Sequence, residues 1–212
     1  MIIAVDGPTA SGKGTIAKQI AAHYGLAHLD TGLLYRAVGR QVALDGGDPD
    51  TEADALAACG FPDDLLEDPV LRSEEVGALA SRVSIHPAVR TALFERQRAF
   101  ATRPGGAVLD GRDIGTVIAP DADVKLFITA SVQERARRRW LEMTKAHIGR
   151  EDEIPLIEIE RDIVARDARD INRADAPLKA APDAFVVDTT HFDPDQAFEA
   201  VLEVVDQALA RR

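Results

Sequence analysis

Residues 4–15 read Ala4-Val5-Asp6-Gly7-Pro8-Thr9-Ala10-Ser11-Gly12-Lys13-Gly14-Thr15. An apolar, β-branched run precedes this stretch at 2–5, and a segment with helix-forming character follows it at 16–24. The pattern G-x-x-x-x-G-K between a strand and a helix is typical of a loop that wraps a phosphate chain, because glycine leaves backbone N–H groups open to the ligand. The stretch therefore predicts a nucleoside triphosphate site at the first strand-to-helix turn.

This phosphate loop combines two ways of holding an anion. The Lys13 ammonium would reach the β and γ phosphates, and the N-terminus of the following helix would add free N–H donors and a partial positive charge. We therefore expect ATP to bind together with Mg²⁺. The residues expected to bind ATP are Gly7, Pro8, Thr9, Ala10, Ser11, Gly12, Lys13, Gly14 and Thr15.

The composition predicts a soluble, cytoplasmic globular protein. The 212 residues are 46% hydrophobic and 29% charged, which suits one well-buried core. A net charge of −11 argues against a nucleic-acid partner, so basic groups should be concentrated locally. Cys59 is the only cysteine, so no internal disulfide can form. We expect no signal peptide, no membrane span and no membrane partner.

Strand and helix patterns alternate along the chain. After the first strand, further strands are predicted at 26–30, 107–110, 124–128 and 185–188. Helices are predicted at 16–24, 33–44, 52–58, 73–83, 87–102, 132–147, 156–174 and 195–209. This alternation predicts an α/β fold, a P-loop three-layer sandwich with a parallel five-stranded sheet and helices on both faces. Ligands bind such sheets at the carboxyl ends of the strands.

Two further segments would face that same edge of the sheet. The strand at 107–110 ends in the carboxylate of Asp110, and Gly111-Arg112-Asp113-Ile114-Gly115 follows at once. A carboxylate on the strand beside a phosphate loop suits Mg²⁺ or its water shell. We therefore predict that Thr15 and Asp110 hold the metal, directly or through a bound water. Tyr35-Arg36, just inside a predicted helix, would face the same cleft.

The two predicted helices at 132–147 and 156–174 are rich in arginine. Many of these charges have the i,i+4 spacing of ordinary surface ion pairs. However, Arg166, Asp170 and Arg173 share one helical face. A largely polar pair of helices could close as a lid, excluding water and bringing arginines to the transferring phosphoryl group. We expect phosphate contact from at least some of Arg135, Arg139, Arg166 and Arg173.

Longer strings are more specific than the phosphate loop. They are Leu29-Asp30-Thr31-Gly32, Arg72-Ser73-Glu74-Glu75-Val76, the run DGRDIGTV at 110–117 and the run RDARDINR at 166–173. With these strings and G-K-G-T at 12–15, the chain resembles a bacterial-type cytidylate kinase, a CMP/dCMP kinase of the nucleoside monophosphate kinase family, over nearly its whole length. Between Gly47 and Arg72 there is no room for the small three-stranded sheet of the long form, so a short-insert form is expected.

The resemblance implies roles for particular residues. Cytosine offers one donor and two acceptors, so a carboxylate, an arginine and a serine can read its edge. The residues implied in reading the base are Ser81, Arg90 and Asp113, with Tyr35 and Asp170 meeting the nucleoside. The residues implied in holding the acceptor phosphate or ribose are Arg36, Arg112, Arg166 and Arg173. The residues implied in catalysis are Lys13, Arg112, Arg139, Arg166 and Arg173.

The implied reaction is the transfer of a phosphoryl group in line from ATP to CMP or dCMP. The acceptor phosphate has a second pKa of about 6 and is mostly a nucleophilic dianion at neutral pH, so no general base is required. We expect a monomer, because a hinged lid moves most freely alone, and one kinase domain, 1–212. Its parts would be a core at 1–45, 104–133 and 183–212, an acceptor-binding lobe at about 46–103 and a lid at about 134–175.

Two other classes of function stay open at this point. A P-loop kinase could act on UMP, on another nucleoside monophosphate, or on an alcohol such as shikimate or gluconate. An alcohol would require a base and fewer phosphate-binding arginines, so the arginines favour a phosphorylated acceptor. A nucleotide-dependent switch or binding module is the other alternative, although the guanine-reading string N-K-x-D is absent.

Overall fold

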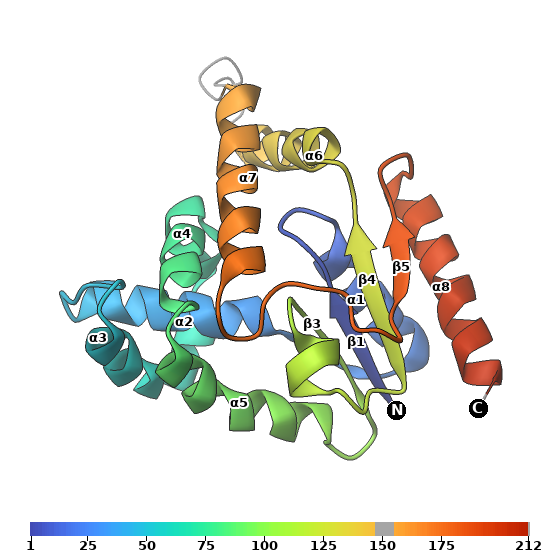
Figure 1. Ribbon diagram of the computed structural model, residues 1–212, viewed down its shortest axis with the longest axis horizontal. Helices are drawn as coiled ribbons and strands as arrows, with labels where there is room; N and C mark the ends of the chain where they lie inside the picture. The colour runs from blue at the N-terminus through green and yellow to red at the C-terminus, as the bar shows by residue number, and fades with distance from the viewer. Residues whose placement is uncertain (147–154, 212) are drawn as a thin grey trace.

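A parallel sheet forms the centre of the protein (Figure 1). The structure is a computed structural model and describes residues 1–146 and 155–211. Within these residues the sheet has five strands in the order β2-β3-β1-β4-β5, all parallel. The strands are β1 Ile2–Asp6, β2 Ala27–Asp30, β3 Ala107–Gly111, β4 Val124–Thr129 and β5 Phe185–Asp188. The predicted parallel five-stranded sheet is therefore confirmed.

Helices cover both faces of this sheet, so the central strand β1 is buried on both of its faces. Ile3 and Val5 of β1 pack with α1 (Lys13–Tyr24) and α8 (Pro194–Ala210). Ala4 points the other way and packs in a second cluster with Ala101 of α5 (Pro87–Ala101). Strands buried on both faces read as continuous apolar runs, which is why the strands were visible in the sequence.

A third cluster holds a helical lobe at one end of the sheet. It joins α5 to α2 (Thr31–Leu44), α3 (Glu52–Ala57) and α4 (Glu74–Val83). Between α2 and α4 the chain forms α3 and short 3₁₀ turns at 58–60, 63–67 and 69–72. The described chain has no strand between β2 and β3. This agrees with the expected short insert.

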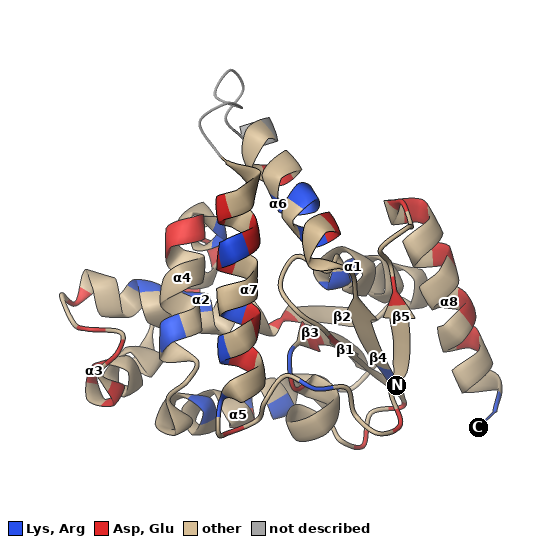
Figure 2. Cartoon of the chain, turned by 45° about the horizontal axis from the view of Figure 1, so that its top comes forward, with Lys and Arg blue, Asp and Glu red and all other residues tan. Residues whose placement is uncertain are grey.

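Two more helices, α6 (Val132–Ala146) and α7 (Leu156–Asn172), stand above the carboxyl ends of the strands (Figure 1). They pack on each other through Ala136, Ile159 and Ile163. The end predicted for α6, His147, lies outside the described residues. The charged stretch 149–155, whose sequence indicates a turn, also lies outside them except for Pro155. Figure 2 shows acidic segments along α8 and α3, whereas α6 and α7 carry both basic and acidic segments.

Three helix boundaries differ from prediction by two residues or more. α1 begins at Lys13 because Gly12 adopts a left-handed conformation with φ of 86° and forms its N-cap. α2 begins at Thr31, where the hydroxyl donates to the Asp110 carbonyl at 2.8 Å. α7 ends at Asn172, before the predicted Ala174, because the Leu178 N–H donates to the Asp170 carbonyl at 2.8 Å, the acceptor that residue 174 would use in a helix.

Searching the described residues, we found no helix that combines the length and the apolar character needed to cross a bilayer.

Candidate active site

The phosphate loop joins β1 to α1 and lines the larger of two adjoining cavities. Gly7 is required by close approach, because a Cβ there would lie 2.1 Å from the Ile128 carbonyl oxygen. Lys13 Nζ donates to the Pro8 carbonyl at 3.2 Å. The larger cavity has a volume of about 330 Å³. The loop residues that line it are Thr9, Ala10, Ser11, Gly12, Lys13, Gly14 and Thr15, whereas Gly7 and Pro8 do not line it.

Lys13 lies where its charge is poorly solvated. Desolvation at the base of the cavity, reinforced by the nearby Arg112 guanidinium, lowers the pKa of Lys13 from 10.5 to about 8. Asp110 and Asp30 act in the opposite direction. A bound polyanion would compensate for the lost solvation of Lys13, because phosphate oxygens would replace the lost water and favour the ammonium form.

Carboxylates from two neighbouring strands line the same cavity beside the phosphate loop. Asp30 and Asp110 are register partners at the ends of β2 and β3. The Asp110 Oδ1 atom contacts His28 Nε2 at 2.7 Å, and its Oδ2 atom lies 3.5 Å from where a Gly14 Cβ would stand. Burial, and then the Asp110 charge, raise the pKa of Asp30. A cation between these carboxylates and the loop would relieve that repulsion.

The smaller cavity collects every side chain that the sequence implied for the acceptor. Its volume is about 60 Å³, well below the roughly 300 Å³ of a typical ligand pocket, so an acceptor could enter only if side chains or helices shift. The implied residues that line it are Tyr35, Arg36, Ser81, Arg90, Arg112, Asp113, Arg166, Asp170 and Arg173. They come from α2, α4, α5, α7, the residue after α7 and the turn after β3.

Positive charge is in excess in this smaller cavity. Of the described residues, five arginines but only two carboxylates line it. Arg90 pairs with Asp113, and Arg112 pairs with Asp170. Arg166 has a buried Nε atom without a hydrogen-bond partner among the described residues. Burial and the neighbouring Arg112 lower its pKa to about 9. A bound anion would stabilise this site, because it would accept a hydrogen bond from the buried Arg166 Nε atom and offset the two neighbouring positive charges.

Residues shared by the two cavities mark where they meet. The side chains of Arg36, Arg112 and Arg166 line both cavities. Comparison with known proteins identifies the family of the chain. Residues 3–207 match the family model described as Cytidylate kinase. The chain belongs to the cytidylate kinase family.

Relatives in this family match the chain over nearly its whole length. It is 50% identical to the cytidylate kinase of Rhodopseudomonas palustris (strain TIE-1), with coverage of 100% of this chain and 99% of that protein. It is 53% identical to the cytidylate kinase of Methylocella silvestris, covering 98% of this chain and 95% of the relative. The crystal structure of an uncharacterized protein from Eubacterium ventriosum has a TM-score of 0.56 at 14% identity, with coverage of 97% of this chain and 98% of that one. That likeness concerns the fold alone.

The arginines of α6 in this cytidylate-kinase-family chain serve different purposes. Arg139 lines the larger cavity and pairs there with Glu74 of α4. Arg135 lines neither cavity. It holds the phosphate loop by donating to the Thr9 carbonyl at 3.1 Å, and it pairs with Asp167 at 2.7 Å. In this structure Arg135 is thus a structural support, because its guanidinium is already occupied.

Sequence reasoning missed three side chains that build the site. Asp6 accepts hydrogen bonds from the Ile114 and Gly115 N–H groups, each at 2.8 Å, and burial raises its pKa to about 7. His28 holds Asp110, as described above. Arg138 donates to the Ser11 carbonyl at 3.2 Å and braces the phosphate loop. The only sequence signal for Asp6 and His28 was their position in strands whose ends meet at the site edge.

Proposed function

We propose that this protein transfers the γ-phosphoryl group of ATP to CMP or dCMP, giving ADP and CDP or dCDP. One observation carries the proposal: Arg36, Arg112 and Arg166 line both the phosphate-loop cavity and the acceptor cavity. The terminal phosphate of a donor and the phosphate of an acceptor would meet at these arginines. Membership of the cytidylate kinase family supports the same reaction.

The donor would bind with its phosphates in the loop. Lys13 would hold the β and γ phosphates, and residues 7–15 would supply the backbone donors. Thr15, Asp110 and Asp30 line the same cavity and suit Mg²⁺, whose preferred ligands are oxygens. When bound, Mg²⁺ would offset charge on the phosphate oxygens. Among the described residues, no group of three or more His, Cys, Asp or Glu side chains could hold a metal ion.

We expect ATP binding near pH 8.5 to take up a proton. Free Lys13, with a pKa of about 8, is mostly neutral at that pH, whereas contact with the triphosphate raises its pKa and restores the ammonium form. The uptake should approach roughly 0.7 proton per ATP. Affinity for ATP should therefore fall as the pH rises through 8 to 10. Calorimetric titration in two buffers of different ionisation enthalpy measures the uptake.

A matched variant identifies the group that takes up this proton. Lys13→Arg keeps a cation that stays protonated throughout this range, so most of the uptake should be lost. What is left should be the roughly 0.2 proton that Arg166, with a pKa of about 9 in the same cavity, can take up. Equal uptake by the parent protein and Lys13→Arg would assign the proton to another group and contradict the role of Lys13.

The acceptor would bind with its base between α4, α5 and the turn after β3. Ser81, Arg90 and Asp113 would read the cytosine edge, since together they offer donors and an acceptor. Tyr35 and Asp170 would contact the nucleoside. Arg36, Arg112, Arg166 and Arg173 would hold the phosphate or ribose. Arg173 has a buried Nη2 atom without a hydrogen-bond partner among the residues described, which supports a ligand contact.

Catalysis would depend on position and charge more than on proton transfer. The acceptor phosphate is mostly a dianion at neutral pH, so it can attack without a base. The arginines shared by the two cavities, together with Lys13 and Arg139, would stabilise charge on the transferring oxygens. Closure of α6 and α7 would exclude water from the phosphoryl group. The division into core, lobe and lid, and the monomeric state, stay predictions.

The deciding experiment measures ADP release from ATP and Mg²⁺ with a panel of acceptors. The panel is CMP, dCMP, UMP, AMP, GMP, dTMP, shikimate and gluconate. We expect strong preference for CMP and dCMP, and loss of activity when Mg²⁺ is chelated. Preference for another phosphorylated acceptor would overturn the base assignment. Preference for shikimate or gluconate, or hydrolysis that no acceptor changes, would overturn the proposed reaction.

A further inference from the structure

We propose that Arg169 is a positioning residue that sets base selectivity through Ser81. This inference rests on the proposed function, in which Ser81 contacts the base. Arg169 Nε donates to Ser81 Oγ at 3.2 Å. Ser81 is 3% exposed and lines the acceptor cavity, whereas Arg169 does not line it. Arg169 would therefore act on the base only through the serine.

The chemistry of the hydroxyl explains how an indirect contact can select a base. A serine hydroxyl has one O–H donor and two acceptor lone pairs, and a guanidinium only donates. The bond from Arg169 therefore occupies one of the two acceptor lone pairs. The O–H and one lone pair are left, and the arginines that line the cavity would compete with any further donor for that lone pair. The bond from Arg169 is the sole hydrogen bond recorded for Ser81 Oγ within the described parts of the chain.

The cavity around Ser81 Oγ contains cations that would compete for the same oxygen. Arg90, Arg166 and Arg173 all line this cavity, and each can only donate. Because Arg169 already donates to Ser81 Oγ, the hydroxyl is oriented to give its proton to a base acceptor. Both bases present O2 as an acceptor, but at N3 cytosine presents an acceptor and uracil presents an N–H donor. In the proposed pose the Ser81 O–H meets N3. The arrangement thus favours cytosine over uracil.

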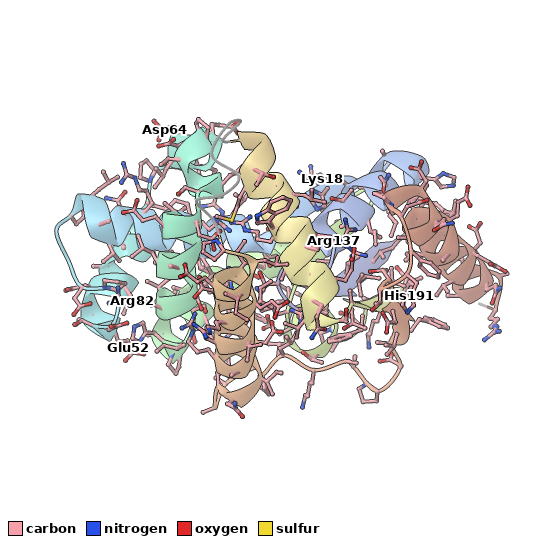
Figure 3. The ribbon with its side chains drawn as sticks, turned by 90° about the horizontal axis from the view of Figure 1, so that it is seen from above. Lys18, Glu52, Asp64, Arg82, Arg137 and His191 are labelled. Atoms are coloured by element: carbon pink, nitrogen blue, oxygen red, sulfur yellow. The ribbon has the colours of Figure 1, made fainter. Side chains whose placement is uncertain are left out.

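The contact also couples base selection to the position of α7. Ser81 belongs to α4, and α7 lies beside α4 in Figure 3 as in Figure 1. Neighbours of Arg169 on α7 bind other elements: Asp170 pairs with Arg112 of the turn after β3, and Asp167 pairs with Arg135 of α6. The Ser81 hydroxyl is therefore oriented only when α7 lies over the lobe, so a base is read most strictly in the closed arrangement.

Steady-state kinetics with CMP and UMP test the proposal. Arg169→Met keeps the apolar stem but removes the donor, and we expect kcat/KM for CMP to fall about fivefold to tenfold, the effect of one lost hydrogen bond. Activity with UMP should change less than about twofold, because uracil carries N3–H, a donor, at the position that the oriented O–H meets. Arg169→Lys should recover part of the selectivity. The matched control is Arg161→Met, which changes an exposed arginine of the same helix.

A double-mutant cycle separates this role from a general effect on α7. If Arg169 acts through Ser81, adding Arg169→Met to Ser81→Ala should cause no further loss of selectivity for CMP over UMP. Additive losses, or an unchanged ratio in Arg169→Met, would overturn the proposal while the wild-type preference for CMP stands. If the wild-type protein itself shows no preference for CMP, the proposed function fails instead.

Discussion

Lys13→Ala is expected to lower turnover at saturating ATP and CMP by about two to three orders of magnitude. Loss of one preorganised electrostatic contact has an effect of that scale. Lys13 lies at the base of the larger cavity, where desolvation strengthens its attraction for phosphate oxygens. The attraction between Lys13 and the phosphoryl group strengthens as negative charge builds on the transferring oxygens. The effect of removing Lys13 should therefore appear in kcat as well as in KM. Measurement of ADP release at saturation tests it.

Lys18→Ala is the matched control for this result. Lys18 lies on the same helix with its side chain at the surface, away from the cavity (Figure 3). Its removal should leave turnover within about twofold, since surface substitutions have small effects. The melting temperature of Lys13→Ala should not fall greatly, because the pKa of Lys13 is lowered in the folded protein and folding therefore disfavours its charged form. Unchanged turnover in Lys13→Ala would remove Lys13 from the mechanism.

Much of the fold could be predicted from the sequence because its signals are local. The strands of a sheet buried on both faces are continuous apolar runs, and the phosphate loop fixes the first strand and helix. Helix ends were harder to predict. α7 ends at Asn172 because Leu178, six residues further on, takes the Asp170 carbonyl. That competition depends on the path of the chain after the helix, which no helical periodicity records.

The candidate site could be predicted as a set of residues but not as a set of contacts. The strings at 110–117 and 166–173 supplied Arg112, Asp113, Arg166, Asp170 and Arg173, and the structure brings these five residues to one cavity. The contacts that site residues make join parts of the chain far apart in sequence: Asp110 contacts His28, and Arg139 pairs with Glu74. An arginine on a helix looks the same in sequence whether it supports a loop, like Arg135, or faces a cavity, like Arg139. Only the packing of α6 on the loop distinguishes them.

Arg112→Ala should weaken use of the acceptor much more than binding of ATP. Arg112 lines both cavities and pairs through Nε with Asp170, so its loss removes a cation from the phosphate site and frees a buried carboxylate. We expect kcat/KM for CMP to fall about 100-fold or more, as for a lost charged contact in a catalytic site. The dissociation constant for ATP should change less than about threefold, since Lys13 and the loop stay in place. Kinetics with varied CMP and equilibrium titration with ATP give the two values.

Stability must be separated from catalysis in this variant. Burial raises the pKa of Asp170, but Arg112, Arg166 and Arg173 outweigh it and hold that pKa below its usual value. Removing Arg112 alone should therefore destabilise the fold, but by less than the roughly 3–5 kcal/mol of a fully unpaired buried charge, because Arg166 and Arg173 stay near Asp170. Adding Asp170→Asn removes the carboxylate that has lost its closest partner, so the double variant should regain stability but not activity with CMP. Recovery of both together would mean that Arg112 acts only by holding α7 in place. A larger loss in ATP binding than in CMP use would move Arg112 from the acceptor to the donor.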